Sequence, residues 1–318
     1  MASKDNKGLN FKTTNFTNNS EPKRTKIGLR TTSSCWFVWF VVEILLVSIS
    51  LVSCNTMPKH LNINLETTDS LPFEGGAFAY VFADVKKARP IIDILPIEEL
   101  KDKQIKQMLD RTRYFAAALY SPTDRRRYQI AAQGVYPRSN AELAMSLNKG
   151  WEKRRSAGGG DYWFSNGTSV LLTSSHAYAA LSQNGDAIDP FTPKPGVQIP
   201  EQFNEFRHGS PLSCWIVNPL ALLNRMLAGL PVQSVKGFYF KLLPSQNKQH
   251  EVIIRLQFEN PSHARGLATL LSFASSYSAD TPLSIFLSNP PVVNGNNVDI
   301  KSVPLSEKEI KSLLELLL

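Results

Sequence analysis

The sequence predicts an α+β fold, in which two tandem ferredoxin-like units of the order β-α-β-β-α-β follow a disordered leader. Three observations favour it: short β-branched and aromatic runs alternate with helical periods, hairpin turn signals separate neighbouring strands, and the same order of elements occurs twice. The expected division is a leader over residues 1–54, a tether over 55–72, a first unit over 73–183, a proline-rich linker over 184–211 and a second unit over 212–318.

The first unit opens with an apolar run over residues 76–83, which predicts a strand. Asp84 can cap a short helix, which we expect to end at Pro90 because proline lacks the backbone donor that a helix interior needs. The elements expected next are a helix over 98–110, a hairpin of strands over 113–120 and 128–136, a helix from Ser139, and a hairpin over 162–173 around Asn166-Gly167.

In the helix that begins at Ser139, Leu143, Leu147 and Trp151 recur at intervals of four residues. This spacing places them on one face of the helix. His176, which follows the second hairpin, is expected to begin a short helix.

The second unit repeats this order. Pro219 is expected to open its first helix, and Ser306 with Glu309 three residues later forms a capping box for the last helix. A strand over 215–217 is expected before Pro219. After the first helix we expect a hairpin with strands over 235–243 and 250–259, and then a helix that opens at 260–262. Two closing strands, over 283–287 and 298–303, are expected before Ser306.

Composition excludes two broad classes of protein. Hydrophobic residues make up 42% and charged residues 19% of the 318, which is typical of a chain with a packed core rather than a disordered one. Of the net charge of +8, half belongs to the leader: residues 1–54 carry seven Lys and Arg against three carboxylates, and the rest of the chain carries 28 against 24. A charge of +4 on so large a domain argues against nucleic-acid binding.

The leader has the pattern of an export signal: basic residues, then an apolar segment over residues 35–54. Its end, Leu51-Val52-Ser53-Cys54, resembles the lipobox of bacterial lipoproteins. The resemblance implies that the leader is cleaved before Cys54 and that the Cys54 thiol is acylated. It is confined to the leader, and no specific family is recognised for the exported domain.

A second interpretation of the leader stays open. Twenty residues are just enough to span a bilayer, and Glu43 is a costly residue inside such a segment, so the leader can also be an uncleaved anchor. Both interpretations place the domain outside the cytoplasm, attached to a membrane. The resemblance to lipoproteins also implies a location: in enteric lipoproteins a residue other than aspartate after the cysteine directs the protein to the outer membrane, and Asn55 holds that position here.

The cysteines do not support a disulfide framework. Cys35 lies in the leader and Cys54 is the expected lipidation site, which leaves Cys214 alone. Cys214 lies in an apolar run, so we expect a buried, unreactive thiol rather than a nucleophile.

Few residues suggest a site. Arg125, Arg126 and Arg127 could contact anionic lipid headgroups, but the sequence favours a solvated hairpin tip, because alternate residues of a strand point opposite ways. The triple glycine at 158–160 lacks the Lys-Ser/Thr that a phosphate loop needs. The five histidines show no metal-ligand spacing. We therefore expect no catalytic, cofactor-binding or metal site.

Two predicted helices, 219–230 and 266–274, are more apolar than a one-sided surface helix requires. The last helix, from Ser306, is amphipathic, with Ile310, Leu313, Leu314 and Leu317 on one side and charges opposite. Packing against a sheet explains them, and so does an apolar groove or a membrane interface. The sequence favours a membrane-anchored envelope lipoprotein that binds a protein partner or an apolar or lipid ligand. The alternatives are an envelope hydrolase or isomerase with a dispersed site, and a protein that contacts membranes through amphipathic helices.

Overall fold

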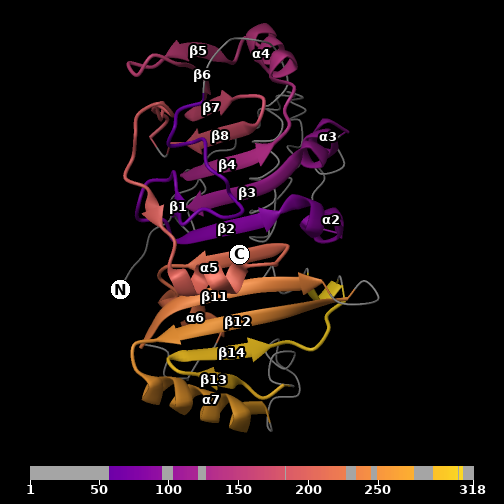
Figure 1. The fold of residues 1–318 in the computed structure, drawn as a ribbon, viewed down its shortest axis with the longest axis vertical. Coiled ribbons are helices and arrows are strands. Elements are labelled where there is room, and N and C mark those ends of the chain that lie inside the picture. The colour runs from indigo at the N-terminus through magenta and orange to yellow at the C-terminus, as the bar shows by residue number, and fades with distance from the viewer. Residues whose placement is uncertain are drawn as a thin grey trace, which may run out of the picture. The chain divides into compact units, whose positions relative to one another are not determined.

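A computed structural model describes residues 57–94, 103–120, 127–182, 184–226, 234–244, 249–275, 289–306 and 308–310. These residues all belong to one compact unit, which spans 33–318 (Figure 1). Within this part of the chain the fold is mixed α and β, with a large antiparallel sheet and few helices. The α+β prediction is therefore confirmed.

Twelve strands of the described residues form one sheet, in the order β13-β14-β12-β11-β10-β2-β3-β4-β8-β7-β6-β5. The strands are β2 (Ala79–Asp84), β3 (Thr112–Leu119), β4 (Tyr128–Gly134), β5 (Glu152–Arg155), β6 (Asp161–Ser165), β7 (Thr168–Leu172), β8 (His176–Leu181), β10 (Leu212–Ile216), β11 (Val235–Pro244), β12 (His250–Phe258), β13 (Val292–Asn294) and β14 (Asn297–Lys301). A separate pair joins β1 (Ser70–Leu71) to β9 (Val197–Gln198).

The helices of the described residues are mostly short. They are α2 (Val85–Ile94), α3 (Lys103–Arg111), α4 (Arg138–Leu147), α5 (Glu201–Arg207), α6 (Leu220–Met226) and α7 (Pro261–Ser275). In the same residues, no helix has the length and the apolar character needed to cross a membrane.

The strands do not pair as predicted for ferredoxin-like units. A ferredoxin-like unit joins parallel strands through a helix and places another strand between them. Here β2 and β3 are direct antiparallel neighbours, with Asp84 opposite Tyr114. Two helices, α2 and α3, connect these strands. They bring the chain back to the C-terminal end of β2, so β3 begins there and runs in the opposite direction. An ion pair of 2.8 Å between Arg89 and Asp110 links the two helices.

The strand order nevertheless follows the chain in both halves, as β2-β3-β4-β8 and as β10-β11-β12-β14. The first strands of the two halves, β2 and β10, pair antiparallel with Val81 opposite Cys214. One continuous sheet therefore runs through both expected units. That the two halves are a tandem repeat stays a prediction.

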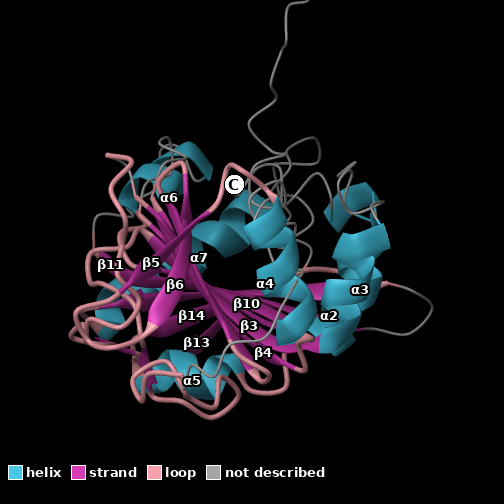
Figure 2. Ribbon diagram, turned by 90° about the horizontal axis from the view of Figure 1, so that it is seen from above, coloured by secondary structure: helices cyan, strands magenta, loops and turns pink. Residues whose placement is uncertain are grey.

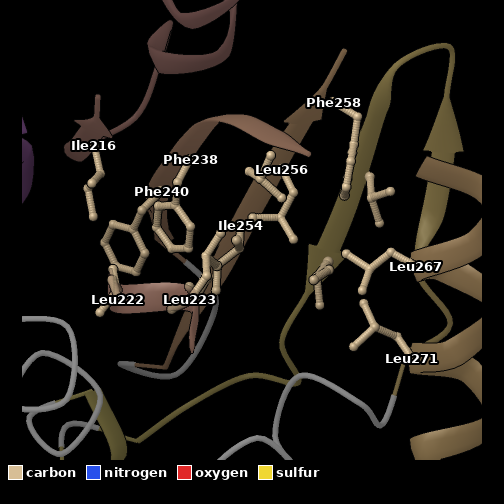
Figure 3. Packing of buried hydrophobic residues seen from close by; sticks show 14 of the residues in the cluster. Ile216, Leu222, Leu223, Phe238, Phe240, Ile254, Leu256, Phe258, Leu267 and Leu271 are labelled. Atoms are coloured by element: carbon tan, nitrogen blue, oxygen red, sulfur yellow. The ribbon is translucent and has the colours of Figure 1, made fainter. Parts of the chain in front are cut away.

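The sheet is covered on both faces. On one face, Phe203 and Phe206 of α5 pack with β-sheet aromatics such as Tyr80 and Tyr239. On the other face lie two separate clusters, one under α4 and one under α6 and α7. Figure 2 shows α5 on the side of the strands opposite to α4, and Figure 3 shows Leu267 and Leu271 of α7 facing the strand residues. The apolar α6 and α7 are thus largely explained by packing.

Two segments expected to be extended connections are part of the core. In the predicted tether, Leu61, Leu65 and Leu71 are at most 2% exposed. The predicted linker contains β9 and α5, and Phe203 of α5 is fully buried. Both predictions were based on a high content of Asn, Thr and Pro, but the few apolar residues among them suffice to pack on the sheet.

Some of the predicted turns and helix ends are present and others are not. The Asn166-Gly167 turn is confirmed, because both residues have positive φ, 45° and 82°. The Ser306–Glu309 capping box is confirmed by hydrogen bonds of 2.8 and 2.6 Å to Glu309 Oε2. By contrast, α2 continues past Pro90, and His176 begins strand β8 instead of a helix. The expected strand over 283–287 lies outside the described residues.

Candidate interaction surface

Helix α4 buries the face opposite to the one that carries its two leucines, Leu143 and Leu147. Its buried residues are Ala141, Glu142 and Met145. Leu143 is 41% exposed and Leu147 72% exposed. We call these two leucines the α4 surface. Trp151, the third residue of the predicted face, is partly buried beside the cluster under α4.

This arrangement follows from helix geometry. Successive residues of a helix are 100° apart, so positions two apart point in nearly opposite directions. Ala141 and Met145 are at most 2% exposed and pack in a cluster with Trp163. Once these two residues face the sheet, Leu143 and Leu147 must face away from it. The spacing of four is shared by both pairs, so the spacing alone could not decide between them.

The buried side of α4 also carries a charge pair. Arg138 Nε lies 3.0 Å from Glu142 Oε1, and the two side chains are only 15% and 10% exposed. Val135, just before the helix, is 76% exposed. This region therefore buries charged groups and exposes aliphatic ones.

A smaller exposed apolar pair lies on α7. Leu270 is 39% and Phe273 64% exposed, while Leu267 and Leu271 of the same helix are buried. Residues three apart on a helix are neighbours on its surface, so Leu270 and Phe273 lie together. At the edge of the sheet, Val292 of β13 is 62% exposed.

Of the three arginines expected to contact anionic lipid, only Arg127 lies within the described residues. Its guanidinium pairs with the Glu74 carboxylate and lies 4.3 Å from the centre of the Tyr120 ring. Lys194 Nζ holds the other oxygen of Glu74 at 2.7 Å. Arg127 is thus engaged in a structural ion network, and its contact with lipid stays a prediction together with that of Arg125 and Arg126.

The network affects the acidity of Glu74. Partial burial would raise the pKa of Glu74, but hydrogen bonds and charge attraction from Lys194 and Arg127 outweigh it, so the pKa is lowered from 4.5. The backbone N–H of Glu74 also donates to Gln129 Oε1 at 2.8 Å. These contacts fasten the loop before β2 to the β3–β4 hairpin. Nothing in the sequence indicated Glu74 or Lys194, because their partners are distant along the chain.

The triple glycine has a structural explanation. A β-carbon on Gly160 would lie 1.8 Å from Cε1 of the Phe191 ring, so only glycine leaves room for that ring. Ser156, at the start of the same loop, donates a hydrogen bond of 2.6 Å to Asp189 Oδ2. The loop over residues 156–160 therefore packs against residues 189–191.

The remaining candidate groups suggest no chemistry. Within the described ranges, no group of three His, Cys, Asp or Glu residues could hold a metal ion. His176 Nε2 lies 3.1 Å from the carbonyl oxygen of Ile63, a structural contact. Burial raises the pKa of the partly buried Cys214 thiol to about 12, which agrees with an unreactive thiol; its low reactivity stays a prediction. Cys54 lies outside the described residues.

Comparison with known proteins adds the family. Residues 71–280 match the model of a family described as outer membrane-associated lipoprotein TP0453. The chain belongs to the TP0453 family. No curated protein matches it. The family match confirms a bacterial lipoprotein and the expected location, a lipid-anchored protein of the cell envelope with the outer membrane favoured over the inner.

Solved structures of TP0453 have the same fold. Crystal form I superposes with a TM-score of 0.54 at 18% identity, over 80% of this chain and 98% of that one. Crystal form III gives a TM-score of 0.54 at 16% identity, over 83% and 99%. The family was not recognisable from the residues of the exported domain, because the resemblance to lipoproteins lies in four residues of the leader.

Proposed function

We propose that this TP0453-family protein is a binding module of the envelope, anchored through acylated Cys54, that binds an apolar partner through the α4 surface. The lipid anchor keeps the domain at the membrane, and the α4 surface supplies the contact. The proposal extends the family assignment, which concerns membrane association, to a specific surface of this chain.

The inverted packing of α4 is the observation that carries the proposal. Keeping a leucine side chain in water instead of burying it forgoes about 2 kcal/mol of hydrophobic stabilisation. A helix that exposes Leu147 while it buries Glu142 with Arg138 is poorly suited to an isolated soluble protein. Apolar side chains that gather on a surface are typical of a binding face.

The membrane itself is the second candidate partner. Leu270 and Phe273 of α7 form another exposed apolar pair, and a lipid-anchored domain stays close to a bilayer. This candidate requires that the apolar residues enter the headgroup region. A protein partner requires only that its own surface bury the exposed apolar residues.

Photo-crosslinking from position 147 distinguishes these candidates. A photoreactive amino acid is placed at Leu147, which is 72% exposed, and, as a control, at Val292 of β13, which is 62% exposed. Cells are irradiated, and the adducts are separated into protein and lipid products. We expect a discrete adduct from position 147 and none of the same kind from position 292. Absence of any adduct specific to position 147 would contradict the proposal.

A further inference from the structure

The folded body begins very close to the expected lipid anchor. Met57 is the first described residue, only three positions after Cys54. Leu61 and Leu65 are 2% exposed in the core. Hydrogen bonds also fasten this segment to the sheet, since Leu65 N donates to Gln133 Oε1 at 3.1 Å. The chain is thus already fixed where a tether was expected.

Covalent geometry then limits the distance between anchor and body. Each residue of a chain spans at most about 3.6 Å, so the Cα atoms of Cys54 and Met57 are no more than about 11 Å apart in any conformation. A lipidated cysteine holds its residue at the level of the headgroups. The part of the body around Met57 must therefore lie within about 11 Å of the level of the headgroups.

Three segments come together beside this point. His60 Nε2 lies 3.0 Å from the carbonyl oxygen of Pro190. Asp189 holds Ser156, and the Phe191 ring fits against Gly160. We call residues 58–60, 157–159 and 191–193 the anchor-proximal surface. Its exposed positions include Lys59, residues 157–159, Thr192 and Pro193. Figure 1 shows the indigo segment that precedes β2 beside β7 and β8, and the carbonyl of Ile63 in this segment contacts His176, the first residue of β8.

We propose that the anchor-proximal surface lies against the lipid headgroups and fixes one orientation of the body on the membrane. Lys59 is an exposed cation at this surface and can contact headgroup phosphates. The inference rests on the proposed anchoring at Cys54. It holds equally for an uncleaved anchor, because the apolar segment of the leader ends at the same residue.

The far end of the sheet provides a control position. The strand order separates β4, against which the segment after Met57 is fastened, from β13 by seven steps. At about 4.8 Å per step, β13 lies roughly 34 Å away along the sheet. Asn294 of β13 is exposed and suits a label.

Energy transfer to labelled lipid headgroups tests the orientation. Two variants of the full-length lipidated protein carry a donor dye, one on Lys59→Cys and the other on Asn294→Cys. Both also carry Cys214→Ala, so that the dye has one attachment site. Each variant is inserted in vesicles of phosphatidylcholine and phosphatidylglycerol. The acceptor is a headgroup-labelled phosphatidylethanolamine. We expect strong quenching from position 59 and weak quenching from position 294. A long Gly-Ser insertion between Thr56 and Met57 should abolish most of this difference.

Each result has a distinct meaning. Vesicle flotation first establishes that the protein is anchored, and failure to float would overturn the proposed anchoring and this inference with it. Flotation with equal quenching from both positions would overturn the fixed orientation alone. A difference that survives the Gly-Ser insertion would also overturn it, because the short connection would then not be its cause.

Discussion

Arg138 and Glu142 form an ion pair of 3.0 Å on the buried side of α4, one turn apart and at most 15% exposed. On the outer side of the same helix, Leu147 is 72% exposed. This relationship defines the candidate surface, since the helix keeps its charges inside and its leucines outside.

Glu142→Ala should destabilise the fold strongly. The change leaves the Arg138 guanidinium in a largely buried position without its carboxylate, at a cost of about 3 kcal/mol. The free energy of unfolding of residues 55–318, measured by urea denaturation, checks this. A loss below the error of the measurement would show that the pair is not buried in solution.

Leu147→Ser should leave the stability of the fold nearly unchanged. An exposed side chain away from special features changes the free energy of unfolding by no more than about 0.5 kcal/mol. The matched control is Leu171→Ala in β7, where the leucine is 2% exposed and its truncation should cost about 3 kcal/mol. If Leu147→Ser were as damaging as the control, α4 would pack with its leucines inward.

Gly160→Ala should destabilise the loop after β5. The added methyl group collides with the Phe191 ring, and overpacking of this kind costs about 2 kcal/mol. Combining it with Phe191→Ala should recover part of the loss, because the ring is then absent. Thermal unfolding of the two single variants and the double variant measures this, and strictly additive losses would argue against the contact.

Glu74 should contribute to acid sensitivity. Its pKa in the folded protein is lowered from 4.5, so the unfolded chain binds more protons than the folded one as the pH falls. The stabilisation is complete above the unfolded pKa and is lost as the pH falls through the folded pKa. Glu74→Gln should therefore flatten the decline of stability below pH 4.5. Urea midpoints across that range test this, and parallel curves for the two proteins would refute it.

Cys214 should resist alkylation in the folded state. Its thiol has a pKa raised to about 12 by burial, so almost no thiolate exists at neutral pH. Iodoacetamide treatment of residues 55–318 carrying Cys54→Ala, followed by mass spectrometry, should show modification only in denaturant. Rapid modification without denaturant would show that the β2–β10 pairing opens readily.

Local signals in the sequence predicted local structure well. The Asn166-Gly167 turn and the Ser306–Glu309 capping box depend on residues next to each other, and both are confirmed. The buried β12, which alternates with a period of two, is equally clear. Such features need no information from the rest of the chain.

Features set by distant contacts could not be predicted in this way. The antiparallel return from β2 to β3 depends on how α2 packs with α3, and both ferredoxin-like and observed pairings fit the same order of elements. The α4 surface was missed for a similar reason, because Ala141 and Met145 share the spacing of Leu143 and Leu147. Only the cluster around Trp163 decides which pair is buried.

Lipidation at Cys54 is the claim on which both the proposed anchoring and the proposed orientation depend. Metabolic labelling with a radioactive or clickable fatty acid tests it most directly, in cells that express the wild type, Cys54→Ala or the control Cys214→Ala. We expect label in the wild type and in Cys214→Ala and none in Cys54→Ala. Label that persists in Cys54→Ala would contradict lipidation at Cys54, and with it the proposed anchoring.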